Sequence, residues 1–511
     1  MLFENWKRTS LPDVAQAQSR SNVSVMCLNA VRSILVLLAL GPIVVHAADA
    51  KRPPNIIFFF ADDLGIGELG CYGQKKIQTP HVDQLAQEGM KFTQHYSGNA
   101  VCAPSRCCLM TGKHSGHAYI RSNREFKPEG QEPIPAEEVT LAELLKEKGY
   151  VTGAMGKWGL GPVNSSGDPL SQGFDHFYGY NCQRVAHNYY PTHLWKDREH
   201  IRLEGNDAGL KGEKFAPDLY TDAALQFIEA NKDRPFFLYF PTIVPHVALQ
   251  VPEDSLAQYT GKFEEIPYEG NKGYLPHPTP YAAYAAMVSR MDRDLGRTLD
   301  LLRRLNLENE TIVIFTSDNG PTHNVGGADS DFFESTAGRR GRKGSLYEGG
   351  IRAPAIVRWP GHIAPGTVSN HVCANYDWLP TLLDLTDEPA VKLPAGVDGI
   401  SFAPTLLGKP GEQKQHEFLY WEFPGYGGQQ ALRMGDWKLV RQNLMPQPAK
   451  GQNKQKRKKA TLELFDLKSD ENETHDIADA HPDVVAKMQA IMFREHVPSN
   501  VFRFPALDQP E

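Results

Sequence analysis

Cysteine is scarce in this sequence. Seven cysteines occur in 511 residues, which is too few for a fold built mainly on disulfide bonds. No two of them form a CxxC pair, so the sequence does not predict a zinc site made of thiolates. Three of the seven lie within seven positions, at Cys102, Cys107 and Cys108. This cluster is therefore the place to look for a cysteine with a special role.

Basic residues are not in excess. The chain carries 54 Lys and Arg against 61 Asp and Glu, a net charge of −7, so no global positive field favours nucleic acid as a partner. One dense basic run, at residues 454–459, lies in a Gln-, Asn- and Lys-rich stretch. We interpret it as a solvated loop rather than a patch for an anionic polymer.

A long apolar run is also missing. The most apolar stretch, residues 34–45, is short and is interrupted by a Gly-Pro pair, so we expect no stable insertion into a membrane. Arg32 before it and Ala47 and Ala48 after it give the pattern of a secretory signal peptide. We therefore predict a signal peptide at residues 1–48, with Met26 as the more natural start. The protein is then exported, to the periplasm or the medium, or to a secretory or lysosomal compartment in a eukaryote. An uncleaved membrane anchor is the alternative.

What the sequence does contain, from about residue 54 to about 390, is an alternation of strand-like and helix-like segments. The predicted strands are residues 55–60, 150–155, 235–240 and 311–316, and the predicted helices are residues 82–90, 141–148 and 281–302. Such alternation predicts an α/β fold with a large, mostly parallel central sheet sandwiched by helices. We assign residues 52–400 to this larger domain.

The pattern of apolar and polar residues changes after about residue 400. Short apolar segments at residues 418–421, 437–440 and 462–466 indicate strands of an antiparallel sheet, and residues 484–494 indicate a terminal helix. We expect residues 401–511 to form a smaller C-terminal α+β subdomain.

Polar side chains follow four of the predicted strands. In chain order they are Asp62 and Asp63, Lys157, His246, and Asp318 and Asn319. Because ligands of open α/β sheets gather beyond the carboxyl ends of the strands, these groups should meet at one edge. Three carboxylates and one amide oxygen suit a hard cation, Ca²⁺ or Mg²⁺. For a single acidic pair, a helix cap or a turn is the simpler interpretation.

Cys102 lies just before a predicted helix at residues 107–110. A side chain at a helix N-terminus faces unpaired N–H groups, which makes it a natural place for a tetrahedral oxyanion. On this reasoning Cys102 is a candidate nucleophile with Arg106 one turn further on. A buried structural cysteine is the alternative.

The segment Cys102-Ala103-Pro104-Ser105-Arg106, with Leu109, Thr111 and Gly112 after it, resembles the signature of the type I sulfatases, which belong to the alkaline phosphatase superfamily. Further motifs resemble this family in the right order, from about residue 53 to residue 467. They are Pro54-Asn55-Ile56-Ile57 with Asp62-Asp63, Thr79-Pro80-His81-Val82-Asp83-Gln84-Leu85-Ala86, Gly156-Lys157-Trp158, Pro245-His246, Ser317-Asp318-Asn319-Gly320, and Lys343-Gly344 with Glu348-Gly349-Gly350-Ile351-Arg352.

The resemblance implies a sulfatase, that is, a sulfuric ester hydrolase. In that family a formylglycine-generating enzyme oxidises the cysteine, here Cys102, to an aldehyde that acts as a hydrated gem-diol. The implied metal ligands are Asp62, Asp63, Cys102, Asp318 and Asn319, with Ca²⁺ favoured over Mg²⁺. The implied catalytic residues are Arg106, which orients the diol, Lys157 and Lys343, which neutralise the sulfuryl group, and Lys343 or His246 as proton donor to the leaving oxygen.

The sequence gives less information about the substrate. The resemblance is to arylsulfatases and favours a sulfated carbohydrate or another sulfated small molecule. The aromatic and histidine-rich residues 186–195 could line a sugar pocket or be an ordinary packed loop. A phosphoester or phosphonate hydrolase of the same superfamily, a non-catalytic binder of sulfated glycans and an unrelated thiol hydrolase remain alternatives.

One position departs from the family pattern. Gly159 stands where the family usually has a histidine, two residues after Lys157. Our first candidate for its replacement is His187, and His114 and His117 are second candidates. A bound water, or a slower enzyme, would also be consistent with the sequence.

Overall fold

The computed structural model describes residues 52–271, 273–386, 391–445 and 459–508. These residues all belong to one compact unit. The predicted signal peptide and the basic run up to residue 458 lie outside the described residues. No helix in the described part of the chain is both long and apolar enough to cross a membrane.

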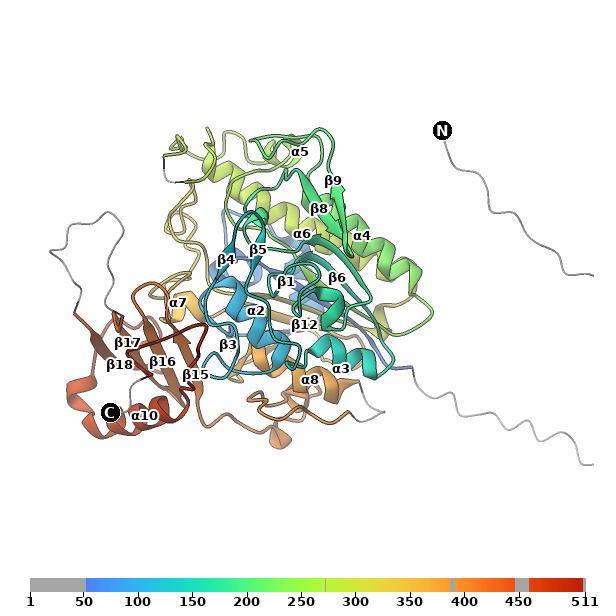
Figure 1. Ribbon diagram of the computed structural model, residues 1–511. Coiled ribbons are helices and arrows are strands. Elements are labelled where there is room, and N and C mark those ends of the chain that lie inside the picture. Colours follow the sequence, from blue (N-terminus) through green and yellow to red (C-terminus); the bar gives the residue numbers. More distant parts are fainter. Residues whose placement is uncertain (1–51, 272, 387–390, 446–458, 509–511) are drawn as a thin grey trace, which may run out of the picture. The chain divides into compact units, whose positions relative to one another are not determined.

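A single ten-stranded sheet forms the centre of the larger part of the molecule (Figure 1). Its strands, in spatial order, are β13 (Thr367–Ser369), β2 (Met90–Phe92), β12 (Ala355–Arg358), β11 (Thr311–Ser317), β1 (Asn55–Ala61), β10 (Phe236–Pro241), β6 (Val151–Lys157), β7 (His176–Tyr180), β8 (His193–Lys196) and β9 (Glu199–Arg202).

The middle of this sheet is parallel and its margins are mixed. The run β11-β1-β10-β6-β7 pairs in parallel, whereas β12 pairs antiparallel with both β11 and β2, and β8 pairs antiparallel with both β7 and β9. The predicted mostly parallel sheet is confirmed. The short antiparallel strands at its margins were not predicted.

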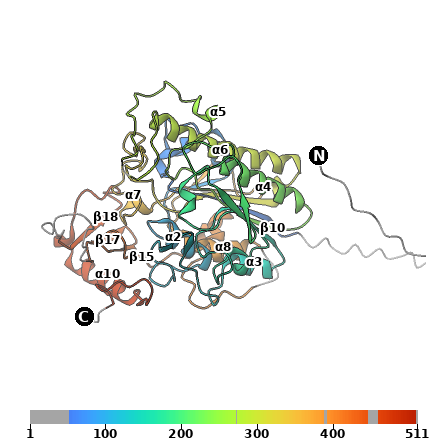
Figure 2. The same ribbon diagram turned by 45° about the horizontal axis from the view of Figure 1, so that its top comes forward.

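Helices cover both faces of the sheet, because the central strands are apolar on both sides. Along β1, Ile57 and Phe59 join one core with residues of α1 (Pro80–Glu88), α4 (Ala216–Ala230) and α6 (Pro280–Arg304). The alternating Phe58 and Phe60 join the other core with residues of α2 (Cys102–Thr111), α3 (Leu141–Glu147) and α8 (Trp378–Leu385). Figure 2 shows α4 and α6 on one side of the sheet and α2, α3 and α8 on the other. The predicted α/β sandwich is confirmed.

A second sheet of four antiparallel strands follows after residue 400. It consists of β15 (Leu419–Phe423), β16 (Gln429–Met434), β17 (Trp437–Gln442) and β18 (Thr461–Asp466). On one face, Leu432 and Leu464 pack with Met488 and Met492 of α10 (Pro482–Arg494). On the other face, Trp421 belongs to the same core as α2. The predicted antiparallel sheet and helix are both present, and β16 is an additional strand.

The remaining β-strands and α-helices are short. They are β3 (His95–Tyr96) paired with β14 (Cys373–Ala374), β4 (Glu125–Phe126) paired with β5 (Gly130–Gln131), α5 (Glu253–Leu256), α7 (Glu348–Ile351) and α9 (Ala403–Leu406).

Helices α1 and α2 differ most from their predicted bounds. Helix α1 starts at Pro80 rather than at residue 82, because proline is well suited to the first helical turn, and Met90 belongs to β2 instead. Helix α2 starts at Cys102 rather than at residue 107. Pro104 lies in the first turn of α2, where a backbone N–H is not needed. Cys102 is therefore the first residue of the helix itself.

Candidate active site

The polar residues that follow the predicted strands lie at the ends of four neighbouring strands. β11, β1, β10 and β6 are adjacent and parallel, so their carboxyl ends share one edge of the sheet. This arrangement brings together Asp318 and Asn319 after β11, Asp62 and Asp63 after β1, His246 after β10 and Lys157 at the end of β6.

Cys102 lies against these residues. The side chain is 1% exposed, and its Sγ atom is 3.3 Å from Asp62 Oδ1 and 3.5 Å from Lys343 Nζ. Sγ and potential ligand atoms of Asp62, Asp63 and His246 all lie within 4.8 Å of one another. The first residue of α2 therefore meets the edge of the sheet at one compact cluster.

Three cations neutralise the three carboxylates. Lys157 Nζ is 2.6 Å from Asp62 Oδ2, Arg106 Nη2 is 2.8 Å from Asp318 Oδ2, and Lys343 Nζ is 2.8 Å from Asp63 Oδ2. The carboxylates are fully buried, and the side chain of Lys343 is 9% exposed. Because the charges balance, the cluster can accept a divalent cation together with an anion at a modest change in net charge.

The thiol of Cys102 is not poised as a nucleophile. Burial, together with the nearby Asp62 carboxylate, raises the pKa of Cys102, so the side chain stays a neutral thiol near pH 7. A reactive cysteine instead needs a lowered pKa. This environment disfavours the alternative of an unrelated thiol hydrolase.

The pKa values of two of these carboxylates are shifted in opposite directions. Burial and the charge of Asp62 raise the pKa of Asp318 to about 7, against the influence of Arg106. Burial also acts to raise the pKa of Asp62, but the positive charges of Lys157 and Arg106 hold that pKa well below its usual value. The buried environment thus gives two chemically identical carboxyl groups different pKa values.

The oxygen atoms in the cluster fit a hard cation. Asn319 Nδ2 donates to Asp63 Oδ1 at 2.8 Å, while Asn319 Oδ1 is buried and has no hydrogen-bond partner among the described residues. The Asp63 backbone adopts φ = 64°, and its N–H donates to Asp318 Oδ1 at 3.0 Å. An unsatisfied carbonyl-type oxygen beside carboxylates is a suitable donor set for Ca²⁺ or Mg²⁺.

His246 presents a free nitrogen to the cluster. Its Nδ1 atom is hydrogen-bonded to the Val247 carbonyl oxygen, which can only accept, so Nδ1 carries the proton. Nε2 is then an acceptor, and it lies 3.6 Å from Asp63 Oδ2. Burial and the charge of Lys343 lower the pKa of His246 well below its usual value, which is consistent with a neutral imidazole.

His187, predicted as a replacement for the missing histidine, lies next to His246. The two rings stack with centroids 4.5 Å apart and an interplanar angle of 6°. Burial and the neighbouring His246 lower the pKa of His187 well below its usual value. His187 thus contacts the imidazole that faces the cluster.

The structure does not bring His114 and His117 to this cluster. Both follow the far end of α2, roughly 14 Å along its axis from Cys102 at 1.5 Å per residue. His117 Nδ1 is 2.9 Å from Asp398 Oδ1. The Gly116 N–H donates to His114 Nδ1, so His114 Nε2 carries a proton and lies 3.3 Å from Glu495 Oε2. These two histidines therefore belong to a separate hydrogen-bonded cluster.

The N-terminus of α2 offers fewer N–H groups than expected. The Ala103 N–H donates to Asn123 Oδ1 at 3.2 Å, and Pro104 has no N–H. An oxyanion near residue 102 would therefore depend mainly on side-chain cations, aided by the helix dipole.

The sequence analysis missed Gln183, a buried residue at the site. Gly159 has φ = +88°, and a Cβ atom built there would lie 2.7 Å from Gln183 Nε2 and 3.6 Å from Arg106 Cδ. Gln183 follows β7, the strand next to β6. The same strand-end reasoning, applied to residues after 180, would have identified it, but β7 was not among the predicted strands.

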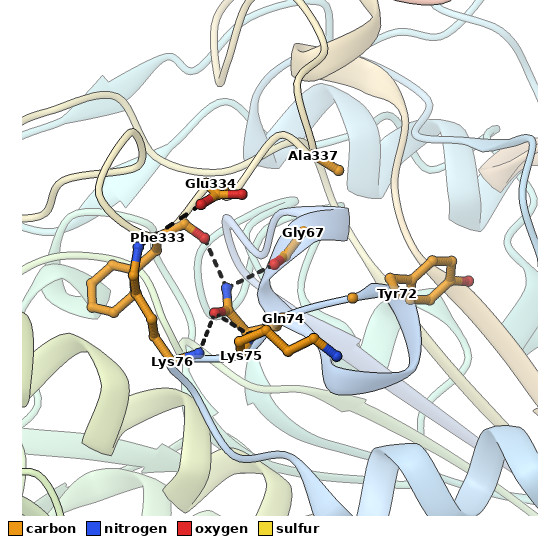
Figure 3. Close-up of a pocket in the computed structure, with 9 residues that line it drawn as sticks. Gly67, Tyr72, Gln74, Lys75, Lys76, Phe333, Glu334 and Ala337 are labelled. Atoms are coloured by element: carbon orange, nitrogen blue, oxygen red, sulfur yellow. Dashed lines mark hydrogen bonds and ion pairs between the residues drawn. The ribbon is translucent and has the colours of Figure 1, made fainter.

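A small pocket near the segment that follows Asp63 contains a buried glutamine whose amide is fully hydrogen-bonded. It has a volume of about 140 Å³ and is lined in part by Gly67, Gln74 and Phe333. Figure 3 shows the Gln74 amide donating to the carbonyl oxygens of Gly67 and Phe333, each at 2.8 Å. Its oxygen accepts from two backbone N–H groups. This amide is fully satisfied, and none of the cluster residues lines the pocket.

Comparison with known proteins agrees with this geometry. The family model described as Sulfatase matches residues 54–388, and one described as N-sulphoglucosamine sulphohydrolase, C-terminal, matches residues 342–496. Human arylsulfatase A is 34% identical over 443 residues, which cover 80% of this chain and 78% of that protein. An N-acetylgalactosamine-6-O-sulfatase of Bacteroides thetaiotaomicron is 31% identical over 506 residues, which cover 86% of this chain and 93% of that protein.

A solved structure is also similar. The crystal structure of Ps i-CgsB in complex with k-i-k-neocarrahexaose aligns with a TM-score of 0.71 at 26% identity, covering 87% of this chain and 94% of that chain. The predicted resemblance and the predicted class of enzyme, a sulfuric ester hydrolase, are thereby confirmed. From its fold, the cluster at the strand ends and these matches, the chain belongs to the sulfatase family.

Proposed function

We propose that the protein hydrolyses sulfate monoesters of a carbohydrate, using a formylglycine made from Cys102 and a divalent cation bound beside it. The observation that supports this most directly is the buried cluster at Cys102, in which Asp62, Asp63 and Asp318 are each paired with a cation. Such a balanced site suits a bound metal ion and a sulfate group together.

The cation would be held by Asp62, Asp63, Asp318 and Asn319, with the oxidised side chain of residue 102 as a further ligand. When bound, it supplies positive charge that polarises the ester. An enclosed set of protein oxygens favours Ca²⁺, because Mg²⁺ usually keeps several waters. Once hydrated, the aldehyde form of residue 102 supplies one hydroxyl for attack on sulfur and a second that permits release of sulfate.

The chain's own residues supply charge and proton transfer. Arg106 lies one turn beyond residue 102 and orients its side chain, and Lys157 and Lys343 offset charge on the sulfuryl group. Lys343 Nζ, which lies 3.5 Å from Cys102 Sγ, would protonate the leaving oxygen. His246 suits acceptance of a proton at Nε2. His187, stacked on it, supports the orientation of that ring.

A sulfated carbohydrate is the substrate class we favour. The related proteins named above include an N-acetylgalactosamine-6-O-sulfatase and a complex with k-i-k-neocarrahexaose. Within residues 186–195, Tyr189 and Tyr190 are buried in the core, so only part of that stretch is available to line a sugar pocket. His187 stacks on His246 and so contacts the cluster.

We also propose that the protein is exported and matured before it acts. Residues 1–48 would be removed as a signal peptide, and a formylglycine-generating enzyme would oxidise Cys102. N-terminal sequencing of the protein from its host should give a start near residue 48 or 49. A retained N-terminal segment would contradict export by this route.

The mass of the peptide that contains residue 102 tests the proposal. Conversion replaces the thiol sulfur and two hydrogens by one oxygen, so a formylglycine peptide is lighter than the cysteine peptide. The mature protein should contain this lighter peptide and should hydrolyse the sulfate ester of an aryl alcohol faster than the phosphate or phosphonate ester. Faster turnover of either phosphorus ester would favour the superfamily alternative.

The variant Cys102→Ser should fold normally and lose turnover, because a serine has no second hydroxyl for release of sulfate. A covalently sulfated serine is expected on incubation with substrate. Cys71→Ser is the matched control, since Cys71 is a half-buried cysteine away from the cluster. Activity of Cys102→Ser comparable to that of the wild type would refute the mechanism.

A further inference from the structure

The backbone that carries Gln183 is fixed beside the backbone that carries Lys157. β6 and β7 pair in parallel up to Lys157 and Tyr180, and the pairing continues beyond the strands, because the Gly159 N–H donates to the Asn181 carbonyl at 3.2 Å. The Gln183 N–H then donates to Gln131 Oε1 at 2.9 Å. The position of Gln183 next to residue 159 is therefore set by the sheet.

The side-chain amide of Gln183 is buried and unsatisfied. The residue is 1% exposed, and neither Nε2 nor Oε1 has a hydrogen-bond partner within the described part of the chain. Leaving both ends of a buried amide unpaired is costly. The buried amide of Gln74 in Figure 3, in contrast, has hydrogen-bond partners at both ends. Both ends of the Gln183 amide are therefore available to a group that binds from outside the chain.

The position of the amide indicates where such a group would bind. Gln183 Nε2 lies 2.7 Å from the place of a Cβ atom at residue 159, and this place is 3.6 Å from Arg106 Cδ. Arg106 itself contacts Asp318 and lies 3.5 Å from Asp62 Oδ2. The amide therefore lies on the Arg106 side of the cluster at Cys102.

We infer that Gln183 hydrogen-bonds the sulfate group in this site. Its amide occupies the volume that a side chain at residue 159 would otherwise fill. The inference rests on the proposed sulfatase function. The amide nitrogen supplies two donors for sulfate oxygens, and the amide oxygen can accept from a hydroxyl. A neutral amide does not take up a proton near pH 7. Gln183 therefore binds the sulfate group, and proton transfer is left to His246 and Lys343.

The variant Gln183→Met tests this, because methionine has a similar length and no hydrogen-bonding amide. On an aryl sulfate, kcat/KM should fall about 10- to 100-fold, the usual effect of losing a hydrogen bond to a charged group. Inhibition by inorganic sulfate should weaken by a similar factor, a readout that a packing role would not move. Gln183→Glu should lose more activity than Gln183→Met, because its charge repels sulfate.

Gln172→Met is the matched control, since Gln172 is also a buried glutamine but lies at the end of a 3₁₀ turn after residue 168. Its kcat/KM and its inhibition by sulfate should stay near wild-type values. If Gln183→Met keeps the wild-type kcat/KM and inhibition by sulfate within about twofold, the inference is wrong. A thermal melt of each variant identifies any that fail to fold, and Gln183→Asn then provides the alternative substitution. Failure of the proposed function would show separately, as a wild-type protein inactive on sulfate esters.

Discussion

Asn319 shows how one buried atom can indicate an absent ligand. Its nitrogen is used by Asp63, whereas its Oδ1 atom is buried without a partner among the residues described. A cation beside Asp63 would satisfy that oxygen. We therefore expect Asn319→Ala to weaken Ca²⁺ binding about tenfold or more, which is ~1.4 kcal/mol, as measured by calorimetric titration of the chelator-treated protein.

The comparison variant is Asn324→Ala, which removes an exposed asparagine that is bound to Asp331. It should leave Ca²⁺ affinity unchanged. Equal affinities for the two variants and the wild type would mean that Asn319 is not a ligand.

At the same scale, the sequence identified most residues of the cluster because each directly follows a strong β segment. Asp62, Asp318 and His246 were found from local patterns alone. Gln183 was not, because β7, the strand before it, was not among the predicted strands, and because its proposed role depends on the absence of a side chain at Gly159, 24 residues earlier. The relation between the two positions exists only once β6 and β7 are paired.

At the scale of elements, continuous apolar segments were the most predictable. β1, β10 and β11 lie in the parallel centre of the sheet and are buried on both faces, so their sequences carry a strong signal. β2, β13 and β16 are short or mixed in character, and their strand state depends on pairing with distant partners. The C-terminal antiparallel sheet was predicted with one strand fewer for this reason.

The short 3₁₀ helix η1 (Ile66–Glu68), which follows the β1 aspartates, carries an unusual carboxyl group. Glu68 is fully buried, accepts a hydrogen bond from the Gly65 N–H at 2.7 Å and contacts the Tyr284 hydroxyl. Burial raises the pKa of Glu68 from 4.5 to about 7, against the hydrogen bonds from Tyr284, Ser335 and Gly65. The folded state therefore favours the protonated form.

This shift predicts a pH dependence of stability. A pKa that is raised in the folded state contributes stability that is complete below pH 4.5 and is lost as the pH rises to about 7. At 1.36 kcal/mol per pKa unit, the loss is ~3 kcal/mol. Glu68→Gln cannot ionise, so its free energy of unfolding relative to the wild type should rise by about this amount over that range, as measured by urea unfolding at fixed calcium concentration.

Glu334→Gln is the control for this experiment, because Glu334 is exposed and lies near Gly67. Its stability relative to the wild type should not change with pH. A constant difference between Glu68→Gln and the wild type from pH 4.5 to 7 would show that Glu68 has an ordinary pKa.

At the scale of the whole described unit, the C-terminal sheet is joined to the larger sheet by apolar and charged contacts. Trp421, Val440 and Phe465 belong to the same core as α2. Gln429 donates to the Gly344 carbonyl at 2.6 Å and accepts from the Leu346 N–H at 3.1 Å. The C-terminal sheet therefore holds the backbone next to Lys343, a proposed catalytic residue.

A buried charge network completes this connection. Lys438 of β17 is fully buried, and its Nζ atom is 2.8 Å from Glu348 Oε1 of α7 and 3.0 Å from Glu473 Oε1. Removing the lysine would leave two buried carboxylates without their shared cation. We expect Lys438→Met to lower the free energy of unfolding by about 3 to 5 kcal/mol, the usual effect of breaking a buried ion pair, as measured by denaturant unfolding.

The exposed residue Lys468 provides the matched substitution, because Lys468→Met removes the same charge at the surface and should change stability by less than about 0.5 kcal/mol. Adding Glu473→Gln to Lys438→Met should recover part of the loss, since it removes one of the unpaired charges. If Lys438→Met and Lys468→Met unfold at the same denaturant concentration, the network contributes nothing measurable. The attachment of the C-terminal sheet would then depend on the apolar contacts of Trp421 and its neighbours alone.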